Sequence, residues 1–330
     1  MIPPETAPEF LARHGWAGAE IRPLAGDASF RRYFRVHLDG RTAVLMDAPP
    51  EHEDVGPFLT VVGHLLDRGL SPPRPLAIDR ARGLLLLEDF GDDRVAPLLQ
   101  RAPEREREIY DVAVDILARI AAQPAPDDLA PYDDAAMARE VALFTDWYVP
   151  AFGLEVAEDS FLPAWREAWR DVLRIVEDNP VLVLRDYHAD NLMVLPRRDD
   201  LGLLDFQDAL AGHPAYDLVS LLQDARRDVA PALEEAMIDR YAEAANVADR
   251  ATFRAHYEVL GAQRNTKILG IFTRLWKRDN KPHYPSMHPR IWGYLERNLA
   301  HPALAPVRAW FDANVPAEKR AAAWSREATA

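Results

Sequence analysis

The chain has 330 residues and a mass of 37.2 kDa, enough for a sizeable core or for two lobes. Its formal net charge of -14 argues against nucleic acid or an anionic membrane surface as a partner. It contains no cysteine, which excludes disulfides and thiolate metal sites. The first ten residues carry prolines and acids rather than a basic stretch followed by an apolar one, and no apolar run is long enough for a membrane span. We therefore expect a cytoplasmic protein.

The N-terminal part has the hydrophobic pattern of a small β-rich unit. Apolar residues alternate or follow helical spacing in a way that predicts a strand, a tight turn, a second strand, a helix and a third strand. In chain order these elements are expected at 28–38, 39–40, 42–46, 54–67 and 83–87. A polar stretch at 88–92 follows and is the expected hinge.

The remainder is predominantly helical. Amphipathic patterns predict seven helices, at 104–122, 133–149, 160–178, 217–226, 232–246, 249–278 and 288–300. Two brief apolar strands, 181–184 and 201–204, interrupt them, and each runs directly into acidic residues. The expected fold is therefore α+β, with a small antiparallel β lobe at 1–90 and a larger helical lobe at 91–330.

The two brief strands carry the residues most suited to chemistry. Asp186 follows the first strand, Asn191 comes five residues later, and Asp205 follows the second strand. Transfer of a phosphoryl group needs a carboxylate to orient and deprotonate the acceptor hydroxyl, and oxygen ligands for Mg²⁺. Asp and Asn are also common in loops at strand ends. The spacing and the order of the lobes favour the functional interpretation.

The run Asp186-Tyr187-His188-Ala189-Asp190-Asn191 matches the pattern Asp-x-His-x-x-Asn. In this pattern the chain resembles the aminoglycoside phosphotransferase-like branch of the protein-kinase fold. The resemblance implies a two-lobed kinase fold that uses ATP and Mg²⁺. It also implies Asp186 as catalytic base, His188 as a residue that orders the loop, Asn191 and Asp205 as metal ligands, and Asp217 as a brace for the catalytic loop.

Four further blocks, which begin at Gly26, Leu204, Asp217 and Gly261, are similar to the bacterial amino-sugar kinases of this family. This resemblance implies ATP-dependent phosphorylation of the anomeric hydroxyl of N-acetylmuramate or N-acetylglucosamine, in peptidoglycan sugar recycling. The expected partner is a small amino-sugar substrate, and a monomer is favoured.

The residues expected to bind the ATP phosphates depart from the kinase pattern. The position usually held by a third-strand lysine is Met46, and the first lysine of the chain is Lys267. Arg32 is the preferred substitute, because on the predicted strand it shares a face with Phe34 and Val36, which we expect to cover the nucleotide. A guanidinium is a competent phosphate partner. An arginine on a solvated strand face is the equally weighted alternative.

The rest of the nucleotide site is predicted from loop chemistry and from the resemblance. The phosphate loop has a single glycine, Gly26, and we expect its amides and the Ser29 hydroxyl to cradle phosphate. Adenine is expected at the hinge, against backbone groups from Glu88 to Phe90, with Met46 as an apolar wall.

The acceptor side offers two groups of candidates. Gln207 and Asp208 directly follow Asp205 and suit hydroxyl recognition, or they only order the loop. Arg264 and Lys267 belong to a basic stripe on the long predicted helix, and either could pair with the lactyl carboxylate of N-acetylmuramate. Such a stripe is more often a solvated helix face.

Two alternatives remain open from the residues. The first keeps the chemistry and changes the acceptor to an aminoglycoside, choline or another amino alcohol. The second is a pseudokinase that binds nucleotide without catalysis, for which the missing lysine is the best support. Retention of Asp186, Asn191 and Asp205 together argues against it, since a binding protein needs neither base nor metal ligands.

Overall fold

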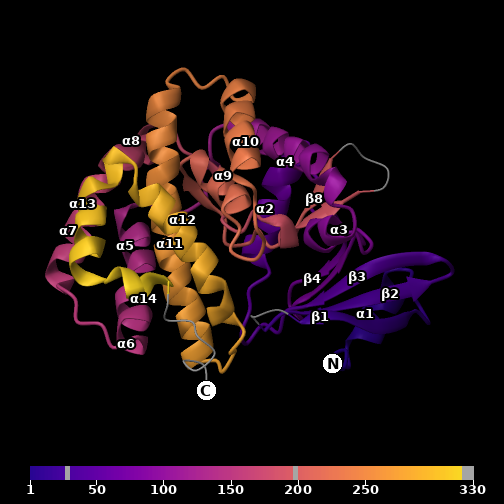
Figure 1. The fold of residues 1–330 in the computed structure, drawn as a ribbon. Coiled ribbons are helices and arrows are strands. Elements are labelled where there is room, and N and C mark those ends of the chain that lie inside the picture. The colour runs from indigo at the N-terminus through magenta and orange to yellow at the C-terminus, as the bar shows by residue number, and fades with distance from the viewer. Residues whose placement is uncertain (27–29, 196–199, 322–330) are drawn as a thin grey trace. The chain divides into compact units, whose positions relative to one another are not determined.

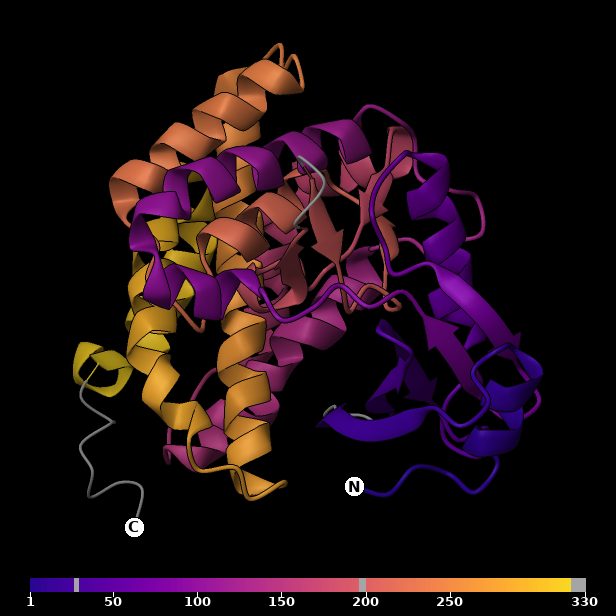
Figure 2. The same cartoon turned by 90° about the vertical axis from the view of Figure 1, so that its right-hand side faces the viewer.

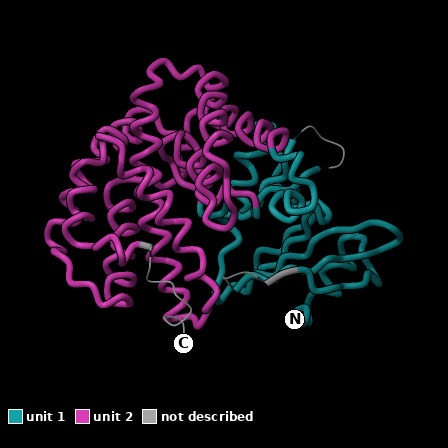
Figure 3. Tube along the Cα trace, viewed as in Figure 1, with its two compact units in different colours: residues 1–106, 190–208 teal, residues 107–189, 209–330 magenta. Residues whose placement is uncertain are grey.

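The computed structural model describes residues 1–26, 30–195 and 200–321. The expected fold class is confirmed: a five-stranded antiparallel sheet precedes a largely helical remainder. The chain forms two compact units (Figure 3). Unit 1 comprises residues 1–106 and 190–208, and unit 2 comprises 107–189 and 209–330. This division differs from the predicted boundary at residue 90.

The sheet of unit 1, drawn in indigo to purple in Figures 1 and 2, has the strand order β1-β2-β3-β5-β4. Its strands are β1 (Glu20–Gly26), β2 (Arg32–Leu38), β3 (Arg41–Asp47), β4 (Pro75–Asp79) and β5 (Leu84–Leu87). The predicted turn between β2 and β3 is present, because Leu38 pairs with Arg41 across Asp39 and Gly40. Both turn residues have positive φ, as a two-residue hairpin of primed type requires. Strands β1 and β4 were not predicted.

One face of this sheet forms the core of unit 1 together with helix α1 (Ala7–Arg13). Phe34 and Val36 of β2 lie on this face and are fully buried in the same core cluster as Phe10 and Leu11 of the helix. Period-two alternation places the next residues of β2, Tyr33 and Arg35, on the opposite face.

Unit 1 also contains helices α2 (Gly56–Asp67) and α3 (Val95–Arg101) and a hairpin of β7 (Leu192–Val194) and β8 (Leu201–Leu203). Backbone hydrogen bonds attach the hairpin to this unit. Leu203 N–H donates to the Ser71 carbonyl at 2.9 Å, and Val194 N–H donates to the Asp93 carbonyl at 2.8 Å. These pairings between distant parts of the sequence explain why 190–208 belongs to unit 1, which local patterns do not reveal.

Unit 2 is a helical assembly around the long helix α11 (Arg250–Lys277). This helix packs against α5 (Asp134–Leu143), α9 (Ala215–Leu222) and α12 (His288–Leu299) (Figure 1). A short antiparallel pair, β6 (Val181–Val183) with β9 (Leu210–Gly212), precedes and follows residues 184–209 in sequence. The other helices are α4 (Glu106–Ala121), α6 (Val149–Ala151), α7 (Glu158–Ala168), α8 (Arg170–Asp178), α10 (Pro231–Ala244), α13 (Ala305–Asn314) and α14 (Ala317–Ala321).

The structure divides two of the predicted helices. The segment 160–178 breaks at Trp169, whose backbone leaves the helical region and whose side chain is fully buried. The segment 133–149 passes into a π-helical turn at Phe144–Tyr148. Within the described ranges, no helix is both long enough and apolar enough to cross a membrane.

Candidate functional site

The hairpin of β7 and β8 brings Asn191 and Asp205 together, although fourteen residues separate them in sequence. Leu192 pairs with Leu203, so the residue before β7 and the residues after β8 lie at the same end. Leu204 N–H donates to the Asn191 carbonyl at 2.9 Å, and Asn191 Nδ2 lies 3.4 Å from Asp205 Oδ2. The two predicted metal-ligand residues are therefore neighbours within unit 1.

The donor chemistry of this pair fits Mg²⁺. Asp205 offers carboxylate oxygens, and a half-turn of the Asn191 amide would present its oxygen beside them. Mg²⁺ is commonly held by one or two carboxylates, with substrate phosphates and water completing its shell. Among the described residues no larger cluster of potential metal-binding His, Asp and Glu side chains occurs. The backbone of Asp205 is left-handed, with φ of 58°, a strained state that is often found at functional positions.

Two further side chains of unit 1 lie at Asp205. Gln207 Nε2 donates to Asp205 Oδ1 at 2.9 Å, so this amide orients the carboxylate. Arg31 Nη2 lies 3.8 Å from the same oxygen, and the arginine is only 9% exposed. Asp208 is exposed. The sequence singled out Gln207 but did not favour Arg31.

The prediction that Arg32 shares a nucleotide-covering face with Phe34 and Val36 is wrong. The face that carries Phe34 and Val36 packs against helix α1, so it cannot cover a nucleotide. The guanidinium of Arg32 pairs instead with Asp47, which is 3% exposed, and donates from Nη1 to the Ile2 carbonyl at 3.2 Å.

Arg35, on the opposite face of the sheet, is held by the predicted hinge. Its Nε lies 2.9 Å from Asp89 Oδ2, and its Nη2 donates to the Gly91 carbonyl at 2.9 Å. Met46 is fully buried and pairs with Tyr33, so it also lies on this opposite face. The hinge and this face of the sheet are thus tied together within unit 1.

The predicted adenine segment is anchored by its backbone and by one ring. Glu88 N–H donates to the Arg74 carbonyl at 2.9 Å. The ring of Phe90 lies over Gly202 of β8, where a β-carbon would come within 2.7 Å of the ring. At the phosphate loop, Gly26 ends β1 and pairs with Arg32, whereas Ser29 lies outside the described residues.

The contact at Gly202 gives a testable prediction. An alanine must displace the Phe90 ring, because two ring carbons would lie 2.7 Å from the new β-carbon and Met193 Cβ only 3.1 Å from it. We expect Gly202→Ala to raise the KM for ATP several-fold while the fold persists. Gly63→Ala is the control, since nothing lies within 4 Å of a β-carbon there. An unchanged KM in Gly202→Ala would show that Phe90 does not border the nucleotide.

In unit 2, Asp186 follows a turn that is clamped by one buried carboxylate. Asp217, on α9, accepts the N–H of Leu184 at 2.6 Å and the N–H of Arg185 at 2.8 Å. Arg185 has φ of 70°, a conformation that costs a non-glycine residue free energy. The two hydrogen bonds compensate that cost and direct the chain into Asp186.

The clamp is reinforced from α11. Ser220 Oγ donates to the Arg185 carbonyl at 3.1 Å, and Arg264 Nη2 donates to Ser220 Oγ at 2.8 Å. Burial raises the pKa of Asp217 to about 7, although the two backbone N–H groups act in the opposite direction. Arg264 is 4% exposed, so it braces the loop from inside the unit and does not belong to a solvated helix face.

His188 and Tyr187 attach the loop that follows Asp186 to other parts of unit 2. Tyr187 Oη donates to the Ala113 carbonyl on α4 at 2.8 Å. His188 Nε2 lies 3.1 Å from Arg226 Nη1. Burial, and then the charges of Arg226 and Arg264, lower the pKa of His188 well below its ordinary value, so the ring is neutral and can accept from Arg226. This arrangement supports the predicted loop-ordering role.

Lys267 belongs to a buried cluster centred on Glu140 of α5. Lys267 Nζ lies 2.7 Å from Glu140 Oε1 and 3.3 Å from the Tyr216 hydroxyl. Arg185 Nη2 donates to the same glutamate oxygen at 2.5 Å. Glu140 was not recognised from the sequence, because its partners lie 45 and 127 residues away and leave no local pattern.

The Asp217 clamp gives a second prediction. In Asp217→Asn one backbone N–H would face an NH₂ group, and a buried donor without an acceptor costs about 1–3 kcal/mol. We expect the free energy of unfolding to fall by that amount and kcat to fall at least about tenfold, because the turn before Asp186 loosens. Denaturant titration and steady-state turnover measure the two effects.

Asp127→Asn, in an exposed loop of the same unit, is the matched control and should change neither quantity. A kcat of wild-type size in Asp217→Asn would contradict the claim that the clamp positions Asp186.

Comparisons with known proteins agree on the class of protein. A family model described as "Phosphotransferase enzyme family" matches residues 20–256. A relative from Caulobacter vibrioides is 40% identical, with 94% of this chain and 96% of the relative covered, and is named N-acetylmuramate/N-acetylglucosamine kinase. A relative from Pseudomonas aeruginosa with the same name is 37% identical, with 91% of each chain covered.

The fold is also similar to solved structures. The ADP-bound aminoglycoside phosphotransferase APH(2'')-Ib matches with a TM-score of 0.58 at 12% identity, over 89% of this chain and 97% of that one. At this level of identity the similarity concerns the fold alone.

Proposed function

The chain belongs to the phosphotransferase enzyme family, and from that premise we propose that it transfers the γ-phosphoryl group of ATP to the anomeric hydroxyl of N-acetylmuramate or N-acetylglucosamine. The observation that carries the proposal is the pair of relatives named as kinases of these two sugars, which align over more than nine-tenths of this chain. The product would be the sugar 1-phosphate, as expected in the recycling of peptidoglycan sugars.

Asp186 is proposed as the base that orients and deprotonates the acceptor hydroxyl. A general base must be held within hydrogen-bonding reach of the proton that it takes. The Asp217 clamp, Ser220 and Tyr187 restrict the backbone on both sides of Asp186, which favours this role. His188 would keep the loop ordered through Arg226.

Asn191 and Asp205 are the residues that would hold Mg²⁺, which when bound neutralises charge on the ATP phosphates. Gln207 supports this role because its amide orients the Asp205 carboxylate. An active phosphotransferase needs both a base and oxygen ligands for the metal ion, and this chain carries candidates for each. The alternative of an inactive nucleotide-binding protein therefore finds no support in the site or among the relatives.

Arg31, rather than Arg32, is our candidate for the missing phosphate cation. Arg31 is buried beside Asp205, where a nucleotide phosphate must come if Asp205 holds the metal ion. Arg32 is already paired with the buried Asp47 and lies on the face that packs against α1. A forked guanidinium can contact two phosphate oxygens at once, which suits it to replace a lysine.

The proposed reaction also favours a cellular compartment and an oligomeric state for the enzyme. ATP and the salvaged sugars meet in the cytoplasm, and an acidic chain without cysteine fits that compartment. A monomer is sufficient, because the proposed base and the metal ligands all come from one chain.

Asp186→Asn tests the base directly. The amide keeps the shape of the side chain and cannot take a proton, so we expect kcat to fall by about 10²- to 10⁴-fold. ATP affinity, measured by calorimetry, should stay close to that of the wild type. Asp190→Asn in the same loop is the control and should retain most of the turnover. Full activity of Asp186→Asn would remove Asp186 from the mechanism.

A paired comparison tests the phosphate cation. We expect Arg31→Gln to lower kcat/KM for ATP by about 10- to 100-fold, as for the loss of a charge-assisted hydrogen bond of about 1.5–3 kcal/mol. Arg31→Lys should recover part of that loss. Arg32→Gln should mainly lower the thermal midpoint, because Asp47 stays buried without its partner. The opposite pattern, with the kinetic loss confined to Arg32→Gln, would restore the assignment made from the sequence.

A further inference from the structure

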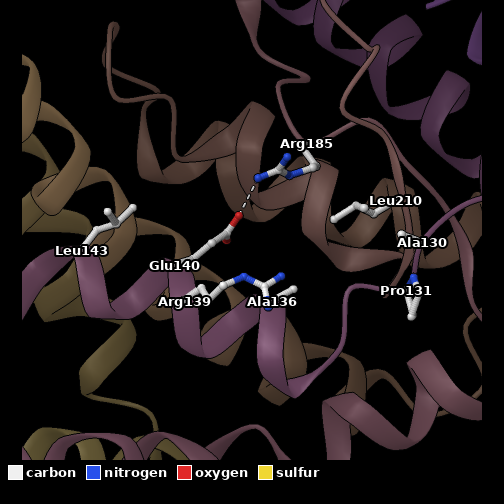
Figure 4. A pocket seen from close by; sticks show the side chains of 8 residues that line it. All are labelled: Ala130, Pro131, Ala136, Arg139, Glu140, Leu143, Arg185 and Leu210. Atoms are coloured by element: carbon white, nitrogen blue, oxygen red, sulfur yellow. Dashed lines mark hydrogen bonds and ion pairs between the residues drawn. The ribbon is translucent and has the colours of Figure 1, made fainter. Parts of the chain in front are cut away.

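Unit 2 contains a cavity of about 370 Å³ beside the turn that leads into Asp186 (Figure 4). Its volume is within the usual range for small-molecule sites. Ala136, Arg139, Glu140 and Leu143 line it from α5, at the i, i+3, i+4 and i+7 spacing of one helix face. The remaining lining residues are Ala130, Pro131, Arg185 and Leu210.

Both carboxylate oxygens of Glu140, the acidic side chain of this cavity, already accept hydrogen bonds from the protein. In Figure 4 Glu140 points toward Arg185, and their ion pair is drawn between them. Lys267 shares Oε1 with Arg185, while Tyr132 and Gln263 donate to Oε2. Burial alone would raise the pKa of Glu140, but Lys267 and Arg185 lower it to about 2. Glu140 is therefore a permanent anion whose oxygens are already taken by protein donors.

The charges around the cavity then leave an excess of positive charge. Arg185 and Lys267 together carry two positive charges against the one negative charge of Glu140. Arg139 adds a third cation to the wall. Its side chain is exposed, and in the part of the chain that the structure describes it makes no ion pair.

The same cluster is close to the proposed base. Although burial lowers it, the pKa of Lys267 is raised overall, mainly by Glu140 and Tyr216, and Asp186 contributes in the same direction. Arg185 also precedes Asp186 directly in the chain. A molecule whose reacting hydroxyl lies at Asp186 therefore has the cavity within reach of its other substituents.

We propose that this cavity receives the acidic substituent of the acceptor sugar and that Arg139 pairs with its carboxylate. The inference rests on the proposed function. N-acetylmuramate differs from N-acetylglucosamine by a lactyl ether at O3, which carries that carboxylate. Arg139 has a guanidinium available for a forked pair, whereas Lys267 and Arg185 are held by Glu140. Arg139 is thus a specificity-determining residue between the two sugars.

The experiment measures the ratio of kcat/KM for N-acetylmuramate to kcat/KM for N-acetylglucosamine. We expect Arg139→Gln to lower this ratio at least about tenfold, chiefly through the KM for N-acetylmuramate, and Arg139→Lys to recover part of it. Arg170→Gln, an exposed arginine of α8 outside the cavity, is the matched control and should leave the ratio unchanged.

The methyl ester of N-acetylmuramate separates charge from shape. If Arg139 recognises the carboxylate, the wild type should use the ester as poorly as Arg139→Gln uses the acid, and the variant should not discriminate between ester and acid. A wild-type ratio in Arg139→Gln, or a variant that still discriminates, would overturn this inference and leave the proposed function intact. A wild type that phosphorylates neither sugar would overturn the proposed function and the inference with it.

Discussion

The buried carboxylate of Asp217 is the group on which the candidate site depends. Its two oxygens accept the consecutive N–H groups of Leu184 and Arg185, and these bonds hold Arg185 in a left-handed conformation that its side chain disfavours. The chain then enters Asp186 in one direction. Without the clamp, the turn would relax toward an ordinary conformation and the proposed base would lose its orientation. A residue that touches no substrate can thus decide whether the base works.

The second organising group is Glu140, which collects four donors from distant parts of unit 2. It joins the side chain of Arg185 to α11, as Asp217 joins the backbone of Arg185 to α9. The turn before the proposed base is therefore held through both the main chain and the side chain of Arg185. The same contacts determine which basic residues remain for a ligand. Lys267 is paired with Glu140 and Arg264 with Ser220, whereas Arg139 lines the cavity.

Local patterns predicted much of this fold, and the failures have physical causes. The β2–β3 hairpin and the long helix α11 follow from alternation, a turn signal and helical spacing. Asn191 and Asp205 could be singled out because Asn191 lies five residues after Asp186, Asp205 follows a short apolar strand, and the resemblance to the kinase pattern implies a ligand role for both. The prediction of which face of the sheet covers the nucleotide was wrong. Alternation defines two faces without saying which one α1 covers, and α1 was not predicted. Arg31 and Glu140 were missed since their partners are remote in sequence. Single-sequence patterns carry no signal for contacts of that kind.

The identity of the acceptor hydroxyl is the central claim, and the product of the wild-type reaction tests it most directly. Purified protein would be incubated with ATP and Mg²⁺ against N-acetylmuramate, N-acetylglucosamine, choline and an aminoglycoside, with phosphorus NMR on each product. We expect a sugar 1-phosphate, formed in step with ADP, from the N-acetylated sugars and no product from the amino alcohols. Phosphate on any other sugar hydroxyl, or turnover confined to choline or the aminoglycoside, would contradict it.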